Sequence, residues 1–411
     1  MFEAYMAILS VFFLFLPLPI LTVVVFWFGI FRNPKQWPIY IWLFLYPIFI
    51  FAYCIEPSYV NDLSRYFMQL EKFGSVSFRE AFQILSDGLF VRDLLFWLIA
   101  KTKNVHLLPA VTTSIMYAIC MYITCDSARR MNKEKYIGIV MVFEVLVIPY
   151  FNIVCNIRNV TAFALICLAG YRDMVHKKRN LITLILYIAP CFLHKTGFVL
   201  LILRLLVIIF ERYMVLSLAI IAGVPFVIDF AYSHVSWIRG GGSFSRVIRL
   251  LILSSHNYLY DDSEYAARLR QGTSIIRLTV FFLIIVLAFY CFRYVFHIKR
   301  EEYREFITFA FTLCVMTVAC AVFDTPAYWR FAVAAYISCA PILLIALSRE
   351  NKEAAMSRTM FLLLGTTAIL RFAMSLRYNW TRMDFDSFAL KALITNAYTV
   401  IYDVISGLRV M

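Results

Sequence analysis

Long apolar segments recur along the whole chain, and they limit its possible folds more than any other feature. Runs such as 106–125, 275–297 and 306–323 are each long enough to cross the ~30 Å hydrocarbon core of a bilayer as a helix. Hydrophobic residues make up 63% of the 411 residues and charged residues only 16%, whereas about 25% of an average soluble domain is charged. A chain this apolar could not cover its own surface in water, which excludes a soluble enzyme and a disordered chain. The sequence predicts an all-α polytopic membrane protein with about 12–13 transmembrane helices, at roughly 30 residues for each span and its loop.

We expect these spans to form a single integral membrane domain over residues 1–411, because no internal repeat or low-complexity tract interrupts them. Two polar stretches should lie outside the bilayer. The first is an outer loop at 56–105 with helices on the membrane surface, and the second is a large arginine-rich loop at 233–274. The apolar run 181–210 is broken at 193–197, so each arm is shorter than a full span, and either two thin spans or a re-entrant pair fits. The other predicted spans cover about 6–31, 37–55, 136–153, 159–175, 213–232, 328–347, 357–375 and 390–407.

The net charge of +14 is a property of the loops. The chain has no long basic run, which argues against nucleic-acid binding; the longest, 176–179, fits a loop at an anionic membrane face. Short loops near span ends are densest in Lys and Arg at 126–135 and 172–180, which places these loops on the cytoplasmic side and the N-terminus outside. The outer face still carries many positive residues, most of them arginine. Arginine is the preferred side chain for bidentate contacts to phosphate and carboxylate groups.

The remaining composition points to no cofactor. The ten cysteines lie mostly in apolar runs without any CxxC pair, so we read them as small apolar side chains and expect neither disulfides nor a zinc site. The chain has no GxGxxG, Walker, HExxH or GxSxG sequence. We therefore expect no metal in the site and no cofactor.

Several polar residues stand where a membrane protein tolerates them poorly, and each is a candidate site residue. All fall at the outer ends of predicted spans under one topology, which a random scatter of structural arginines would not do. Each has a purely structural alternative: an ordinary interfacial helix for Asp62, Arg65 and Tyr66, an arginine that only reaches the interface for Arg158, and a hydrogen-bonded structural histidine for His194. The candidates are Asp62, Arg65 and Tyr66 in the first outer loop, Arg158 at a span start, His194 in the break, Arg330 with Tyr336 further along the same span, and Arg371 inside an apolar run.

The order of these residues resembles the EpsG family of exopolysaccharide polymerases, which is Wzy-like. That family has an Asp followed by Arg/Tyr in an early outer loop, an N-x-I-R element at a span start, H-x-S/T in a central apolar segment, and an Arg followed by a Tyr in a late span. The corresponding positions here are Asp62/Arg65/Tyr66, Asn156-Ile157-Arg158, His194-Lys195-Thr196, and Arg330 with Tyr336. The chain departs from the family at Asn159, where Gln is common, and it has no clear Gly before Asp62.

The resemblance implies a GT-C-like membrane glycosyltransferase in the bacterial cytoplasmic (inner) membrane. Such an enzyme joins undecaprenyl-pyrophosphate-linked repeat units into a capsule or exopolysaccharide at its extracytoplasmic face, without metal or nucleotide sugar. Its partners are the lipid-linked glycan, membrane lipid and a chain-length regulator protein, with no nucleic acid. The resemblance names neither the sugars nor the stereochemical outcome.

Glycosyl transfer from a lipid pyrophosphate needs two kinds of group. Arginines can stabilise the negative charge that develops on the leaving pyrophosphate, and a carboxylate or histidine can take the proton of the acceptor hydroxyl. We assign Arg158, Arg330 and one of Arg239, Arg246 and Arg249 to the pyrophosphate, with Arg65, Tyr336 and Arg371 as further substrate contacts, and either Asp62 or His194 as the base. The competing interpretations are a flippase for lipid-linked oligosaccharide, an O-antigen ligase or related glycosyltransferase, and a membrane acyltransferase.

Overall fold

The structure is a computed structural model that describes residues 19–56, 62–81, 88–210, 214–237, 249, 252–253, 256, 274–297, 301–322, 327–348, 356–380, 391–392 and 394–406. Within these residues the regular elements are helices, and none is a strand. Five helices are long and apolar enough to cross a membrane, or up to seven if each of two bent pairs counts as one span. The chain is therefore an all-α, multi-pass membrane protein, as the sequence predicts. The higher count of 12–13 spans stays a prediction.

The chain divides into two compact units, one of residues 1–201 and 372–411 and the other of residues 202–371. Helices α12 (Gly197–Phe210) and α20 (Arg358–Trp380) each contain one of these division points. Unit 1 also holds α2 (Ile20–Arg32), α3 (Trp37–Cys54), α4 (Asp62–Gly74), α5 (Phe78–Ala81), α6 (Phe90–Lys101), α7 (Leu107–Arg130), α8 (Ile137–Val147), α9 (Tyr150–Cys155), α10 (Ile157–Met174), α11 (Leu181–Leu193) and α22 (Ala397–Ser406).

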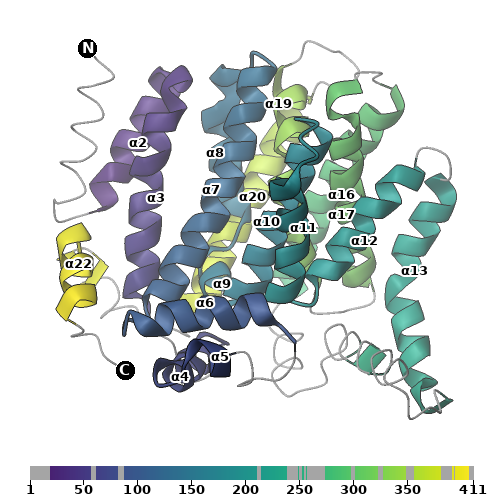
Figure 1. Cartoon of the computed structure of the whole chain (residues 1–411). Coiled ribbons are helices and arrows are strands. Elements are labelled where there is room, and N and C mark those ends of the chain that lie inside the picture. Colours follow the sequence, from purple (N-terminus) through teal and green to yellow (C-terminus); the bar gives the residue numbers. More distant parts are fainter. Residues whose placement is uncertain are drawn as a thin grey trace. The chain divides into compact units, whose positions relative to one another are not determined.

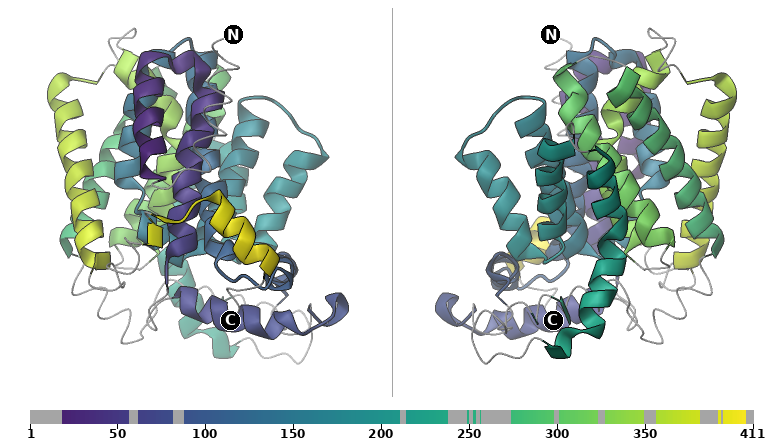
Figure 2. Two further views of the ribbon diagram at one scale, coloured as in Figure 1. Left: turned by 90° about the vertical axis from the view of Figure 1, so that its left-hand side faces the viewer. Right: turned by 90° about the vertical axis from the view of Figure 1, so that its right-hand side faces the viewer.

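The long helices of unit 1 pack side by side, α3 against α7, α7 against α10 and α10 against α11. Helices α4 and α6 lie across the ends of these helices, where α3 ends and α7 begins (Figure 1). Both views in Figure 2 place them at this same end of the unit, called here the α4 end. Helix α4 buries Leu63, Tyr66, Leu70 and Phe73, whose spacing of three and four residues puts them on one face of a helix. Its apolar face thus packs on the unit while its charged face points away.

Unit 2 is built on α16 (Ser274–His297) and α17 (Glu301–Val322), which pack along each other. Helix α17 also packs against α13 (Met214–Ser233) and α18 (Tyr328–Ser338), and α19 (Ala340–Ser348) follows α18. The thiols of Cys291, Cys314 and Cys339 meet in this packing, with Sγ–Sγ distances of 4.0 and 3.9 Å. All ten cysteines of the chain are buried thiols that form no disulfide, as expected of small apolar side chains.

Two runs that the sequence predicts as continuous spans are broken. Residues 136–153 form α8 and α9, because Pro149 lacks an N–H group and holds the preceding Ile148 in an extended conformation. Residues 328–347 form α18 and α19, which meet at an angle of 53°. Pro341 stands just after this bend, where its ring and missing N–H disturb the preceding turn. Each predicted span is thus divided between two helices, and the pair α18 and α19 together is long and apolar enough to count as one bent span.

Candidate functional site

Five polar residues meet at the α4 end of unit 1, and they are called here the Arg158 cluster: Tyr66, Arg158, Asn159, His194 and Thr196. Tyr66 comes from α4, Arg158 and Asn159 from the first turn of α10, and His194 and Thr196 from the break between α11 and α12. Three segments far apart in the sequence thus supply one group of side chains. One contact joins Tyr66 to Arg158, and hydrogen bonds join Asn159, Thr196 and His194; the two sets are connected because Arg158 and Asn159 are consecutive residues of α10.

Arg158 lies over the ring of Tyr66, with 4.7 Å between its guanidinium carbon and the ring centroid. Tyr66 is buried and packs edge-on against Phe96, with 5.9 Å between the ring centroids. The Nε atom of Arg158 is buried and has no hydrogen-bond partner in the part of the chain that the structure describes. A guanidinium that rests on an aromatic face keeps its N–H donors in its own plane. The ring of Tyr66 therefore holds Arg158 in place without using its Nε donor.

The position of Arg158 in α10 adds to its attraction for an anion. It is the second residue of the helix, which begins at Ile157 after the Asn156 cap. The first backbone N–H groups of a helix have no partner within it, and the helix dipole is positive at that end. The start of α10 and the guanidinium therefore favour negative charge at the same place.

Hydrogen bonds connect the His194 side chain to α10. Nδ1 of His194 lies 2.7 Å from the Thr196 hydroxyl, and that hydroxyl lies 3.3 Å from Oδ1 of Asn159, to which it donates. The Thr196 backbone N–H also points to Nδ1, at 3.3 Å. Thr196 is 6% exposed and Asn159 4%, so the link between the break and α10 is buried.

The break itself follows from local sequence. Pro190 lies inside α11, and His194 adopts an extended conformation at its C-cap, with its N–H bonded to the Pro190 carbonyl at 3.0 Å. Helix α12 begins three residues later, at Gly197. A Cβ on Gly197 would lie 3.0 Å from Cα of Cys191 and from the Pro190 carbonyl oxygen, so a larger residue would push the start of α12 away from the end of α11. The interruption that the sequence predicts at 193–197 is confirmed.

Asp62 and Arg65 form an ion pair with each other on α4. The Arg65 side chain is 69% exposed and that of Asp62 is 25% exposed. Asp62 stands four residues before Tyr66, which puts the two side chains on neighbouring turns of one helix face. The pair therefore borders the Arg158 cluster through α4.

The late-span candidates belong to unit 2. Tyr336 on α18 is 1% exposed and Arg371 on α20 is 2% exposed, and Arg371 interacts electrostatically with Tyr336 and Tyr328. The guanidinium of Arg330 lies over the Trp329 ring, 5.5 Å from its centroid. The side chains of Tyr336 and Arg371 are thus both buried within unit 2.

The structure describes only one of the three arginines proposed from the large loop. Arg239 and Arg246 lie outside the described residues. Arg249 is described, in a helical conformation with an exposed side chain. Their assignment to the pyrophosphate stays a prediction.

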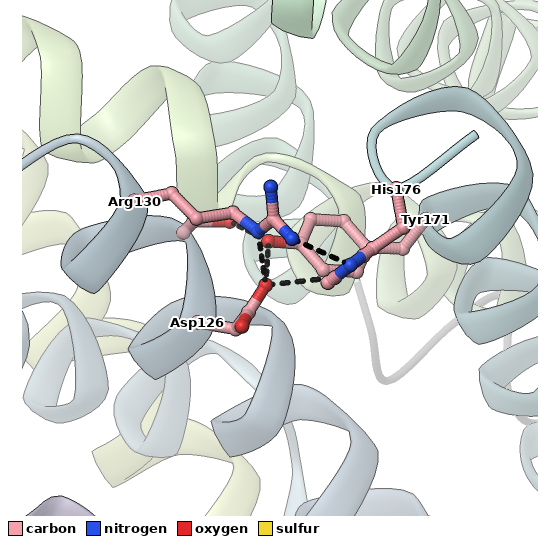
Figure 3. A network of polar contacts seen from close by, with 5 residues as sticks. Asp126, Arg130, Tyr171 and His176 are labelled. Carbon is pink, nitrogen blue, oxygen red and sulfur yellow. Dashed lines mark hydrogen bonds and ion pairs between the residues drawn. The ribbon is translucent and has the colours of Figure 1, made fainter. Parts of the chain in front are cut away.

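A second group of polar residues lies at the opposite end of unit 1, and it is called here the Asp126 network: Asp126, Arg130, Tyr171 and His176 (Figure 3). Oδ2 of Asp126 accepts from the Tyr171 hydroxyl at 2.8 Å, from Arg130 Nε at 3.0 Å and from His176 Nε2 at 2.8 Å. A terminal nitrogen of Arg130 also lies 2.7 Å from Nδ1 of His176. Tyr171 follows Arg158 by thirteen residues on α10, or about 20 Å at ~1.5 Å per residue, so the two groups are well separated.

The contacts of His176 define its protonation. Arginine can only donate, so Nδ1 must hold the lone pair and Nε2 must carry the proton that is donated to Asp126. Burial lowers the pKa of His176, and the positive charges of Arg130 and Lys178 lower it further, whereas Asp126 opposes them. A proton on Nδ1 would face the N–H of Arg130. The network therefore holds His176 neutral, as a structural residue.

The sequence did not single out the Asp126 network, or a further polar group at the α4 end. There Asn104 donates to the Tyr53 hydroxyl at 2.7 Å, and that hydroxyl donates to Asp403 of α22 at 2.9 Å. Lys391 pairs with Glu56 at 2.7 Å. A sign in the sequence is that polar residues flank span ends here, for example Asn104 and His106 just before α7.

Chemically, the Arg158 cluster combines a cation for an anionic group with a histidine that is oriented by a hydroxyl. Either feature suits the transfer of a group from a phosphate ester. Within the described residues, no group of three or more His, Cys, Asp or Glu side chains could hold a metal ion.

Comparison with known proteins adds no relative. No family model, no curated protein and no solved structure matches the chain.

Proposed function

We propose that the chain is a glycosyltransferase of the bacterial cytoplasmic membrane. It joins undecaprenyl-pyrophosphate-linked oligosaccharide units into a polysaccharide at the extracytoplasmic face. The observation that carries the proposal is the Arg158 cluster, in which an arginine held on Tyr66 and a histidine oriented by Thr196 are linked through neighbouring residues of α10. The family resemblance of the sequence supports the same reaction.

In this reaction the bond between the anomeric carbon of the donor sugar and the pyrophosphate oxygen breaks. A bond forms between that carbon and the acceptor hydroxyl oxygen, and the hydroxyl loses its proton. Arg158 and the first N–H groups of α10 stabilise the negative charge that grows on the leaving pyrophosphate. Donors that are already in place cost no reorganisation when this charge develops.

His194 takes the proton of the acceptor hydroxyl. The hydroxyl of Thr196 has one proton, which it donates to Asn159. For Nε2 to accept the proton, the neutral ring must carry its own proton on Nδ1, in which case Nδ1 donates to the Thr196 oxygen over the 2.7 Å contact. In the other tautomer Nδ1 accepts from the Thr196 backbone N–H at 3.3 Å, so the reaction uses the first tautomer. Thr196 and Asn159 act as positioning residues, because their hydrogen bonds fix the place of the imidazole ring in the way that a third group orients the base of a catalytic triad.

Asp62 is the alternative base. Its carboxylate is partly exposed and close to Tyr66 in the helix, but it is already paired with Arg65. A nearby cation lowers the basicity of a carboxylate, so we rank His194 first. Arg330, Tyr336 and Arg371 stay predicted substrate contacts in unit 2.

The glycan of a strain that lacks this protein tests the proposal. A polymerase defect leaves single repeat units attached to their acceptor outside the cell. Lipid-linked units that accumulate on the cytoplasmic side would instead identify a flippase, and unchanged polymer would contradict the proposal. The wild-type gene supplied in trans is the control, and it should restore long polymer.

A further inference from the structure

Glu144 is a buried acid that takes no part in the reaction proposed above. It lies on α8, seven residues after the start of that helix at Ile137, or about 10 Å at ~1.5 Å per residue, and near the middle of the predicted span 136–153. Val140, Met141 and Val147 stand three or four residues from it and are at most 1% exposed. This spacing puts all four side chains on one face of α8. Glu144 itself is 2% exposed, so protein atoms enclose its carboxyl group.

Thr124 of α7 is the hydrogen-bond partner of this carboxyl group. Its hydroxyl oxygen lies 2.7 Å from Oε1 of Glu144, and Thr124 is 0% exposed. Oε2 of Glu144 is buried and has no hydrogen-bond partner in the part of the chain that the structure describes. Cys120 precedes Thr124 by one turn of α7, shares its face and also interacts with Glu144. A thiol is only a weak donor, so the surroundings of the carboxyl group are largely apolar.

No cation pairs with Glu144. Among the described residues no ion pair to it is found, and the effects on its charge come from burial, Thr124 and Cys120. Helices α7 and α2 and residues 134–136 pack against α8. Their basic residues stand near the start of α8, about 10 Å along the helix from Glu144 at ~1.5 Å per residue: Arg32, Arg129, Arg130 and Lys135. The segment 1–18, which precedes α2, contains no Lys, Arg or His.

Three other enclosed acids of unit 1 differ from Glu144, because each has an arginine. Asp93 pairs with Arg92 at 2.6 Å, Asp126 with Arg130 at 3.0 Å and Asp173 with Arg179 at 2.8 Å. An exposed glutamate is ionised at neutral pH. A carboxylate that has lost its hydration is strongly unfavourable unless a cation and a full set of donors replace the water. Glu144 has neither, so the ionised form does not fit this place.

The neutral acid does fit. With the proton on Oε1, the carboxyl O–H donates to the Thr124 oxygen over the 2.7 Å contact, because a hydroxyl accepts as well as donates. Oε2 is then an uncharged carbonyl oxygen, whose missing partner costs far less than a buried charge. We infer that Glu144 is a proton-binding site inside the membrane part of unit 1, which holds its proton at neutral pH with Thr124 as the acceptor. This inference does not depend on the transferase proposal, because Glu144 is not a member of the Arg158 cluster.

Infrared spectroscopy of the full-length protein in lipid nanodiscs at neutral pH tests the site. A protonated carboxyl group has a C=O stretching band that is separate from the bands of carboxylates and amides. We expect this band in the wild type, and Glu144→Gln should lose the intensity of one carboxyl group. Asp173→Asn is the matched control, because Asp173 is a buried acid with a cation, and it should keep the whole band. Thr124→Val keeps the shape of the side chain and should shift the band without removing it.

The wild-type protein provides a second readout, which applies even if a variant does not fold. Incorporation of glutamate labelled with a heavy carbon isotope should shift the band, and labelled aspartate should leave it in place. An unchanged band in Glu144→Gln, or no shift with labelled glutamate, would overturn the inference. Loss of the band when sodium replaces potassium in the buffer would show that a cation occupies the site instead of a proton, and it would overturn the inference as well. Polymer is not measured in any of these experiments, so their outcome is separate from the test of the polymerase reaction.

Discussion

The two ends of unit 1 use the same kinds of side chain in opposite ways. In the Asp126 network, Arg130 and both ring nitrogens of His176 bond to protein partners. In the Arg158 cluster, the arginine is held by an aromatic ring and its buried Nε has no partner in the described part of the chain. Satisfied networks stabilise a fold, whereas a buried donor without a partner requires an explanation, such as a catalytic role or a bound ion. The comparison therefore separates a structural group from a candidate site without reference to residue type.

We expect the largest difference in polymer formation between substitutions of His194 and of His176. His194→Gln keeps the size of the side chain and one hydrogen bond but cannot accept a proton, so polymer formation should fall by about 10²–10⁴-fold, the usual contribution of a general base. His176→Gln should leave polymer formation unchanged, because an amide can donate to Asp126 and accept from Arg130 as the neutral ring does. Polymer is measured on gels from complemented strains with protein levels matched. Normal polymer from His194→Gln would make Asp62 the leading base.

The two arginines give the next comparison. Arg158→Lys keeps the charge and loses the planar donors, and we expect polymer to fall by about 10²-fold, near the lower end of what one charge-stabilising donor contributes. Arg130→Lys should make wild-type polymer, since its partners lie within the protein. Lipid-linked substrate turnover in membranes measures both. Wild-type polymer lengths in Arg158→Lys would mean that this arginine only reaches the membrane interface.

How far the sequence anticipates this contrast depends on the distance between partners. Arg158 stands out because it begins a predicted span, and His194 because it interrupts an apolar run, and polar groups are costly at both places. The contact of Thr196 with Asn159 joins residues 37 positions apart and depends on the packing of α10 against α11, which no local pattern specifies. Asp126 and His176 are 50 positions apart, and each is ordinary for a helix end, so the network became visible only in the fold. The breaks at Pro149 and Pro341 could be predicted from proline chemistry. The predicted spans rested on the length of the apolar runs instead and did not take these prolines into account.

For protein stability, unlike polymer formation, we expect the larger loss at the Asp126 network and the smaller loss at the α4 end. Asp126→Asn removes the charge that receives three donors, and we expect a loss of about 1.5–3 kcal/mol, the range for hydrogen bonds to a charged group. Asp62→Asn breaks an exposed i,i+3 pair and should cost under about 1 kcal/mol. Thermal unfolding in detergent measures both. Equal losses would remove the distinction between a satisfied network and an exposed pair.

The smallest effect concerns pH. The pKa of His176 in the folded protein lies below its ordinary value, so the unfolded chain binds more protons and stability rises with pH. The stability that neutral His176 provides is complete above about pH 6.5, the ordinary histidine value, and is lost as the pH falls toward the lower folded value. His176→Gln should flatten the fall in Tm between pH 7.5 and 5.5, values chosen to bracket that pKa. If the Tm of this variant falls as steeply as that of the wild type, another group controls the response.

Helix α11 has a consequence for the membrane around it. It contains 13 residues, about 20 Å at ~1.5 Å per residue, roughly 10 Å less than the hydrocarbon core of a bilayer. Leu181, Leu184 and Ile188 are exposed on it, so lipid chains contact an apolar helix surface that is shorter than the hydrocarbon core. Such hydrophobic mismatch thins the bilayer locally, and the bilayer surface should dip beside His194. The acyl-chain length of the surrounding lipid should therefore affect the stability of this protein: short-chain lipids match the hydrophobic length of α11 at little cost, and long-chain lipids increase the mismatch.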